Sequence, residues 1–128
     1  MKCTHVAIQV RNIDKTIAFY ARYCGMEAVH ERDEDMRVAW LGWGEDPPQF
    51  VIVALEGSYE RNVQPPYQHI GMAVDSREEV DAVHALAVAD GLTDLWEPRY
   101  AGPIVGYFCG VRDPDDNMVE FSFGQRIG

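Results

Sequence analysis

"THVAIQV", residues 4–10, recurs in pattern as "QHIGMAV" at residues 68–74. In both runs a histidine holds the second place, a valine holds the last, and most of the residues between them are apolar. The two histidines, His5 and His69, are 64 residues apart, which is half of the 128-residue chain. Self-similarity at one fixed spacing is typical of a structural unit that is used twice. We therefore expect two copies of one module.

The residues that follow each run predict a helix. After the first, Asn12 is a capping residue type, and apolar residues then recur at helical spacing until Gly25, which suits a helix end. After the second, Ser76 and Glu79 form a capping box, and the helical spacing ends at Gly91. The apolar positions at helical spacing in the first helix are Ile17, Tyr20 and Ala21.

Short β-like runs complete each module. They cover residues 37–43 and 49–55 in the first half and residues 106–112 and 117–123 in the second, with one shorter run near 26–30 and another near 92–96. We therefore predict a single α+β domain over residues 1–128, built from two βαβββ modules. Module one spans 1–60, module two spans 67–124, and the prolines of the linker 61–66 disfavour regular structure.

Three of the predicted strands divide their side chains between two faces in the same way. Because side chains alternate across a strand, one face of each is bulky and apolar and can pack on a helix. The opposite face is smaller and carries one residue that can bind a metal. If the sheets curve so that these faces converge, two imidazoles and one carboxylate meet, with positions left open for water or substrate. The smaller faces hold His5, Ala7 and Gln9; His69, Gly71 and Ala73; and Met118, Glu120 and Ser122.

A lone histidine on a strand is more often a hydrogen-bonded structural residue than a ligand. The joint pattern favours a metal site, because two histidines hold equivalent places in the repeat and an acid lies in the last strand. His30 and His84 have no partner in the repeat, and we interpret both as structural.

Composition and charge limit the partners. The formal net charge is −10, which argues against nucleic acid and anionic membranes, since both require clustered Lys and Arg. No apolar stretch approaches the ~18 residues of a membrane helix. Cys3, Cys24 and Cys109 form no CxxC pair, so we expect buried, reduced thiols and a cytoplasmic protein.

Nearly the whole chain resembles the vicinal oxygen chelate superfamily, which includes glyoxalase I, extradiol dioxygenases, fosfomycin-resistance proteins and bleomycin-binding proteins. The segments that carry the resemblance are "THVAIQVRNIDKTIAFYARYCGMEAV", "QHIGMAVDSREEVDAVHALAVADG" and "VRDPDDNMVEFSFG". The resemblance implies a cup-shaped mixed sheet around a divalent metal, with His5, His69 and Glu120 as the ligands. It also implies a homodimer, since many relatives dimerise.

Two departures from relatives bear on the chemistry. Glyoxalase I has a fourth ligand, a glutamate, where this chain has Val53. Extradiol dioxygenases and the fosfomycin group usually place a tyrosine where this chain has Gly110. A three-ligand site is therefore expected, and Glu56 and Tyr100 are candidates for a catalytic acid or base.

Three classes of function remain open. The first is a metal-dependent dioxygenase, lyase or isomerase that chelates oxygens of a small substrate, with Fe²⁺ or Mn²⁺ favoured and Zn²⁺ or Ni²⁺ also compatible. The second is a bleomycin-type binding or resistance protein, and the third is a non-catalytic sensor or accessory subunit. The candidate substrate-binding residues are Gln9, Trp40, Phe108 and Met118.

Overall fold

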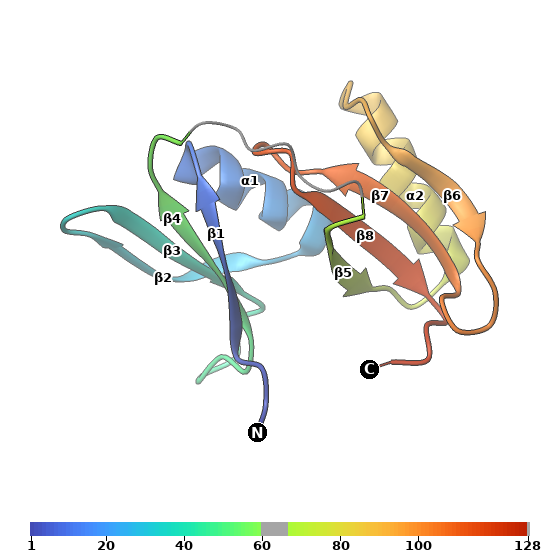
Figure 1. The fold of residues 1–128 in the computed structure, drawn as a ribbon, viewed down its shortest axis with the longest axis horizontal. Helices are drawn as coiled ribbons and strands as arrows, with labels where there is room; N and C mark the ends of the chain where they lie inside the picture. The colour runs from blue at the N-terminus through green and yellow to red at the C-terminus, as the bar shows by residue number, and fades with distance from the viewer. Residues whose placement is uncertain (60–66, 128) are drawn as a thin grey trace. The chain divides into compact units, whose positions relative to one another are not determined.

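The structure is a computed structural model that describes residues 1–59 and 67–127. The chain divides into two compact units, one within residues 1–62 and the other within residues 63–128. Each unit contains one four-stranded sheet and one helix (Figure 1). The predicted linker, residues 61–66, lies outside the described residues.

Module one runs β1 (His5–Val10), α1 (Ile13–Cys24), β2 (Glu27–Asp33), β3 (Arg37–Gly42) and β4 (Val51–Glu56). The sheet order is β1-β4-β3-β2, with β1 parallel to β4 and the other pairs antiparallel. The helix begins where Asn12 Oδ1 accepts a hydrogen bond from the Lys15 N–H at 2.9 Å. It ends at Gly25, whose φ of 62° is left-handed, as the sequence predicts.

Module two repeats this plan with β5 (His69–Ala73), α2 (Arg77–Ala89), β6 (Trp96–Tyr100), β7 (Tyr107–Arg112) and β8 (Met118–Phe123). Its sheet order is β5-β8-β7-β6, and β5 runs parallel to β8. The Ser76 hydroxyl accepts from the Glu79 N–H at 3.1 Å, as expected for the N-terminus of a helix. The prediction of two βαβββ modules is confirmed.

Two local predictions differ from the structure. The strand expected near residues 92–96 begins only at Trp96, because Asp94 adopts a left-handed φ of 56° and turns the chain first. In α1, Ala21 is exposed, and the buried face includes Thr16, whose hydroxyl donates to the Asn12 carbonyl at 3.1 Å. The buried residues of α1 are Ile13, Thr16, Phe19, Tyr20 and Tyr23.

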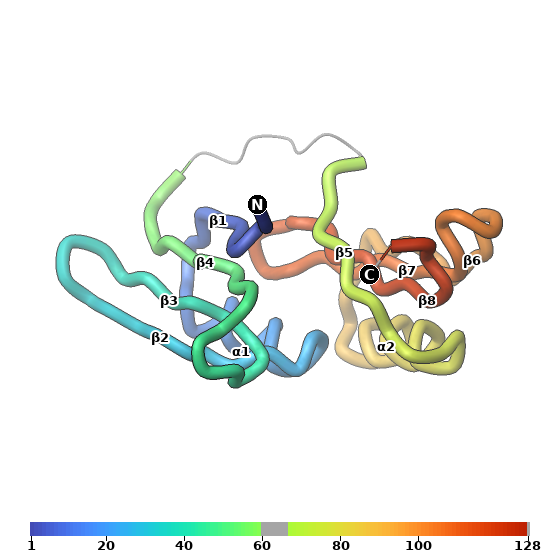
Figure 2. The backbone as a smooth tube through the Cα atoms, turned by 90° about the horizontal axis from the view of Figure 1, so that it is seen from below, coloured from blue at the N-terminus to red at the C-terminus, as the bar shows by residue number. Residues whose placement is uncertain are grey.

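In each module the helix lies on one side of its own sheet (Figures 1 and 2). Burial along β1 and β5 alternates as predicted, since the residues on the smaller faces are exposed. The middle strand β8 differs, because both of its faces are covered and Glu120 is only 5% exposed. Neither α1 nor α2 is long and apolar enough to cross a membrane.

The three cysteines carry thiols rather than disulfides, but they are not all buried as the sequence analysis expected. Cys109 is fully buried on β7, Cys24 is half-buried, and Cys3 is exposed. The exposure of Cys3 follows from its place in the segment that precedes β1, outside the sheet of module one.

Candidate metal centre

In module two, His69 and Glu120 lie on neighbouring strands and approach each other. Glu120 on β8 pairs with Gly71 on β5, and Gly71 is two residues after His69. His69 Nε2 is 3.5 Å from Glu120 Oε2. Two ligands that each lie ~2.1 Å from one cation are ~3 Å apart in octahedral geometry and ~3.4 Å apart in tetrahedral geometry. The spacing of this His69–Glu120 pair therefore fits a shared cation.

The tautomer of His69 follows from its other nitrogen. His69 Nδ1 is 2.7 Å from the backbone oxygen of Tyr67, and a carbonyl oxygen can only accept, so Nδ1 carries the proton. In the neutral ring, Nε2 then holds a lone pair directed at Glu120. A backbone carbonyl that orients a histidine in this way is typical of metal-binding histidines.

Glu120 is held by a residue that follows its strand. The Gln125 side-chain amide donates to Glu120 Oε1 at 2.7 Å, which leaves Oε2 on the side of His69. A buried carboxylate needs such partners, because burial without them destabilises the charged form. Gln125 was not predicted, and no periodic signal marks it, because it reaches Glu120 only after the chain turns at Gly124 with φ 79°.

A hollow of about 420 Å³ opens beside the pair. Small residues of β5 leave this space, since a Cβ added at Gly71 would meet no atom within 4 Å. The residues that line the hollow are His69, Gly71, Ala73, Glu120, Gln125 and Ile127.

His5, the third predicted ligand, belongs to module one. Its Nδ1 is 3.1 Å from Thr4 Oγ1, and its side chain lines a hollow of about 420 Å³ within module one, together with Trp40 and Val53. No three potential ligands among His, Cys, Asp and Glu gather within residues 1–59 or within residues 67–127. The set of His5, His69 and Glu120 therefore remains a prediction that draws on both modules.

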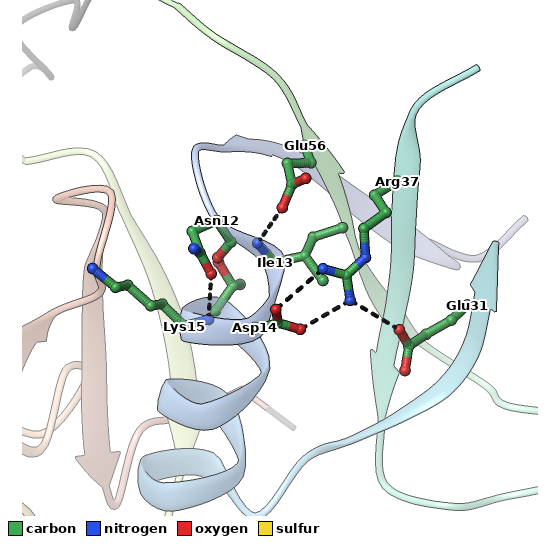
Figure 3. A network of polar contacts seen from close by, with 8 residues as sticks. Asn12, Ile13, Asp14, Lys15, Glu31, Arg37 and Glu56 are labelled. Carbon is green, nitrogen blue, oxygen red and sulfur yellow. Dashed lines mark hydrogen bonds and ion pairs between the residues drawn. The ribbon is translucent and has the colours of Figure 1, made fainter. Parts of the chain in front are cut away.

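Glu56 has a structural contact at the start of α1. Its Oε2 accepts a hydrogen bond from the Ile13 N–H at 2.7 Å (Figure 3). Close by, the Arg37 guanidinium donates to both carboxylate oxygens of Asp14, at 2.9 and 3.2 Å, and this hydrogen bonding lowers the pKa of Asp14. Glu56 lines a hollow with Arg37 rather than the one that contains His5.

Tyr100, the other catalytic candidate, lies on the side of the sheet that faces α2. It pairs with Tyr107, so both side chains share one face. The Tyr107 hydroxyl donates to Asp81 on α2 at 2.7 Å, which raises the pKa of Tyr107. The Arg77 guanidinium lies over both rings, 5.4 Å from that of Tyr100 and 5.1 Å from that of Tyr107. Tyr100 is thus on the opposite face of the sheet from the Glu120 carboxylate.

The candidate substrate-binding residues divide between the modules. Gln9 is exposed on β1, and Trp40 is 39% exposed in the hollow of module one. Phe108 and Met118 share the face of Glu120, but they are only 5% and 1% exposed, so a substrate could reach little of either side chain.

Trp96 is an aromatic residue of the same face that sequence reasoning did not select. Its ring lies against that of Phe108, with 6.2 Å between the centroids. It was missed because the strand that carries it is short and begins at this residue, so alternation could not assign its direction.

Comparison with known proteins extends these observations. Residues 2–121 match the family model of the Glyoxalase/Bleomycin resistance protein/Dioxygenase superfamily. An uncharacterized protein of Pseudomonas aeruginosa is 39% identical over 127 residues, which cover 98% of this chain and 90% of that protein. A probable lactoylglutathione lyase of Vibrio parahaemolyticus is 28% identical, over 91% of this chain and 86% of the relative.

Solved structures share the fold at lower identity. One is a mutant of the fosfomycin resistance protein FosX from Listeria monocytogenes, complexed with Mn(II) and 1S,2S-dihydroxypropylphosphonic acid. Its TM-score is 0.79 at 19% identity, and the match covers 98% of this chain and 93% of the FosX chain. Another is the trypanothione-dependent glyoxalase I of Leishmania major, with a TM-score of 0.74 at 22% identity over 97% of this chain and 87% of its own.

Proposed function

This chain belongs to the Glyoxalase/Bleomycin resistance protein/Dioxygenase superfamily, and from that premise we propose that it is a metal-dependent enzyme. Its proposed ligands for one divalent cation are His5, His69 and Glu120, and its proposed substrate is a small molecule that chelates the cation through two oxygens. The proposed reaction belongs to the dioxygenase, lyase or isomerase types of this superfamily.

The observation that carries the proposal is the state of the His69–Glu120 pair. Hydrogen bonds to Tyr67 and Gln125 leave His69 Nε2 and Glu120 Oε2 facing each other at 3.5 Å. Two electron-pair donors in this arrangement are complementary to a cation. When bound, a divalent metal would supply Lewis acidity to chelated substrate oxygens.

The chain's own residues would prepare the site for this chemistry. Gln125 holds one oxygen of Glu120 and so orients the other, and the Tyr67 carbonyl keeps the His69 lone pair on Nε2. Gly71 leaves room beside the pair for a substrate.

The two catalytic candidates from the sequence receive no role in this proposal. Glu56 accepts the Ile13 N–H, and the ring of Tyr100 lies against Arg77, so each already makes contacts away from the His69–Glu120 pair.

Relatives named lactoylglutathione lyase support lyase-type chemistry in this family. In this chain, however, Val53 holds the position in module one that Glu120 holds in module two, because Val53 pairs with Ala7 and Glu120 pairs with Gly71. Valine cannot bind a metal, so we propose three protein ligands rather than the four of glyoxalase I. An octahedral ion then keeps three positions for substrate and water, which favours Fe²⁺ or Mn²⁺ over Zn²⁺ or Ni²⁺. The Mn(II) complex of FosX agrees with this choice.

We propose a cytoplasmic homodimer, in line with the reduced thiols and with the family resemblance. The net charge of −10 opposes binding to nucleic acid and to anionic membranes.

Elemental analysis of protein purified without added metal, and again after loading with Mn²⁺, tests the proposal. We expect about one ion per chain in the parent and a large loss in His5→Ala, His69→Ala and Glu120→Gln. The matched controls are His30→Ala and Glu97→Gln, which should keep the metal. Retention by His5→Ala would contradict the ligand set. A parent that binds no ion under either condition would leave the alternative, a small-molecule binding protein without a metal.

A further inference from the structure

Glycine flanks Glu120 on both neighbouring strands. Across the sheet of module two, Trp96 pairs with Gly110, Gly110 pairs with Glu120, and Glu120 pairs with Gly71. Directly paired residues point to the same face of a sheet. The carboxylate therefore has no side chain directly beside it on either adjacent strand.

The two glycines differ in what lies above them. A Cβ added at Gly110 would be 2.8 Å from Trp96 Cε3, 2.9 Å from Trp96 Cδ2 and 2.7 Å from Met118 Sδ. At Gly71 it would meet nothing within 4 Å. The indole of Trp96 thus lies directly over the Gly110 backbone, while the space at Gly71 is open.

Further contacts bring the indole to the edge of the metal centre. The Trp96 and His69 rings meet edge to face, with centroids 5.5 Å apart and planes at 73°. Trp96 also packs on Phe108, with 85° between the ring planes. Trp96 is half-buried, so these contacts leave part of the indole accessible. It does not line the hollow at Gly71 and lies instead on the side of Gly110, next to the His69 ring.

We propose that Trp96 is a specificity-determining residue, because its indole forms an apolar wall beside His69 and Glu120. The substrate class that fits this wall carries a flat apolar group, an aromatic or conjugated system, next to its chelating oxygens. This inference rests on the proposed function, since the oxygens need the metal. Gly110 is required for it, because any side chain there would displace the indole.

A matched pair of chelators tests the inference without knowledge of the natural substrate. Acetohydroxamate and benzohydroxamate bind a metal through the same two oxygens, but only the second carries a phenyl ring. The full chain is loaded with Zn²⁺, which is redox-inert and binds N and O ligands more tightly than Mn²⁺ or Fe²⁺. Calorimetry then gives the affinity of each chelator.

We expect the parent to bind benzohydroxamate about tenfold more tightly than acetohydroxamate, the upper range of an aromatic contact. Trp96→Ala should reduce this ratio to about twofold and Trp96→Phe should keep most of it. Trp43→Ala, at a tryptophan of module one, is the matched control and should keep the parent ratio. Circular dichroism checks the folding of each variant, and Trp96→Leu replaces Trp96→Ala if the latter does not fold.

Each result separates the two proposals. If all of these proteins bind zinc, and if the ratio of the benzohydroxamate and acetohydroxamate affinities is the same in the parent as in Trp96→Ala or Trp96→Leu, the role of Trp96 is overturned and the metal centre stands. A parent that takes up no zinc would overturn both. A ratio of affinities that falls in Trp96→Ala or Trp96→Leu at unchanged zinc content, and is kept in Trp96→Phe, would support the wall.

Discussion

Val53 on β4 and Glu120 on β8 hold the same position in the two modules. Each is paired with the residue two places after a histidine, Val53 with Ala7 and Glu120 with Gly71. The repeat therefore places a carboxylate in one module and an apolar side chain at the equivalent point of the other.

If His5, His69 and Glu120 bind one cation as proposed, Val53→Glu should add a fourth ligand, a carboxylate, in the hollow that contains His5. We expect the affinity for Zn²⁺ to rise about tenfold or more, since even residues that only orient ligands change affinity by roughly 10- to 100-fold. Competition with a chromogenic chelator measures the change. Val53→Gln, which has the size of glutamate but no charge, should give no such gain. Equal effects of the two substitutions would contradict the prediction.

Gln125→Ala should weaken metal binding without removing a ligand. The substitution deletes the amide that donates to Glu120 Oε1 at 2.7 Å, so the carboxylate is no longer held toward His69. We expect about a tenfold loss of Mn²⁺ affinity by calorimetry. Gln49→Ala, in an exposed loop, is the control. An unchanged affinity would show that Gln125 does not orient the carboxylate.

Alanine at the two glycines beside Glu120 should have different consequences for stability. Gly110→Ala would place a methyl group within 3.0 Å of Trp96 and Met118, and we expect it to lower the free energy of unfolding by about 1–3 kcal/mol. Gly71→Ala enters open space and should change it by less than about 0.5 kcal/mol. Urea denaturation compares the two, and similar losses would contradict the packing of Trp96.

Glu56→Ala should destabilise the protein and keep the metal. The Glu56 carboxylate accepts the Ile13 N–H at the start of α1, so its removal should cost about 1–2 kcal/mol in the free energy of unfolding. Glu56→Gln should cost less, because an amide oxygen can still accept. Thermal unfolding and elemental analysis measure both effects. Loss of the metal at full stability would instead place Glu56 in the metal centre.

The buried thiol of Cys109 predicts how stability depends on alkaline pH. Burial raises its pKa from 9.0 to about 12. Between these values the unfolded chain loses the proton and the folded chain keeps it, so its stabilising contribution is complete below about pH 9 and is lost as the pH rises toward 12. Unfolding midpoints should fall more steeply above about pH 9 in the parent than in Cys109→Ala. Parallel pH profiles would refute this contribution.

Much of the fold could be predicted because its signals are local. Asn12 and Ser76 mark helix starts through hydrogen bonds to the third residue along the chain, and both bonds are observed. Alternation assigned His69 and Glu120 to the smaller faces of their strands, and the structure brings the two side chains to 3.5 Å. The start of β6 at Trp96 was missed because a left-handed aspartate before it gives no periodic signal.

The sequence by itself determined the two-module plan and the residue types on each strand face, since repeats and alternation are properties of neighbouring residues. Only the tertiary structure decided the tautomer of His69, the contact of Gln125 with Glu120 and the position of Trp96 over Gly110. The position of Trp96 depends on the register of β6 against β7. The partners of His69 and Glu120 lie only two and five residues away, and these contacts depend on the local backbone conformation. A pairing between strands and a local backbone conformation both exist only in the folded chain, and neither leaves a regular spacing along the sequence.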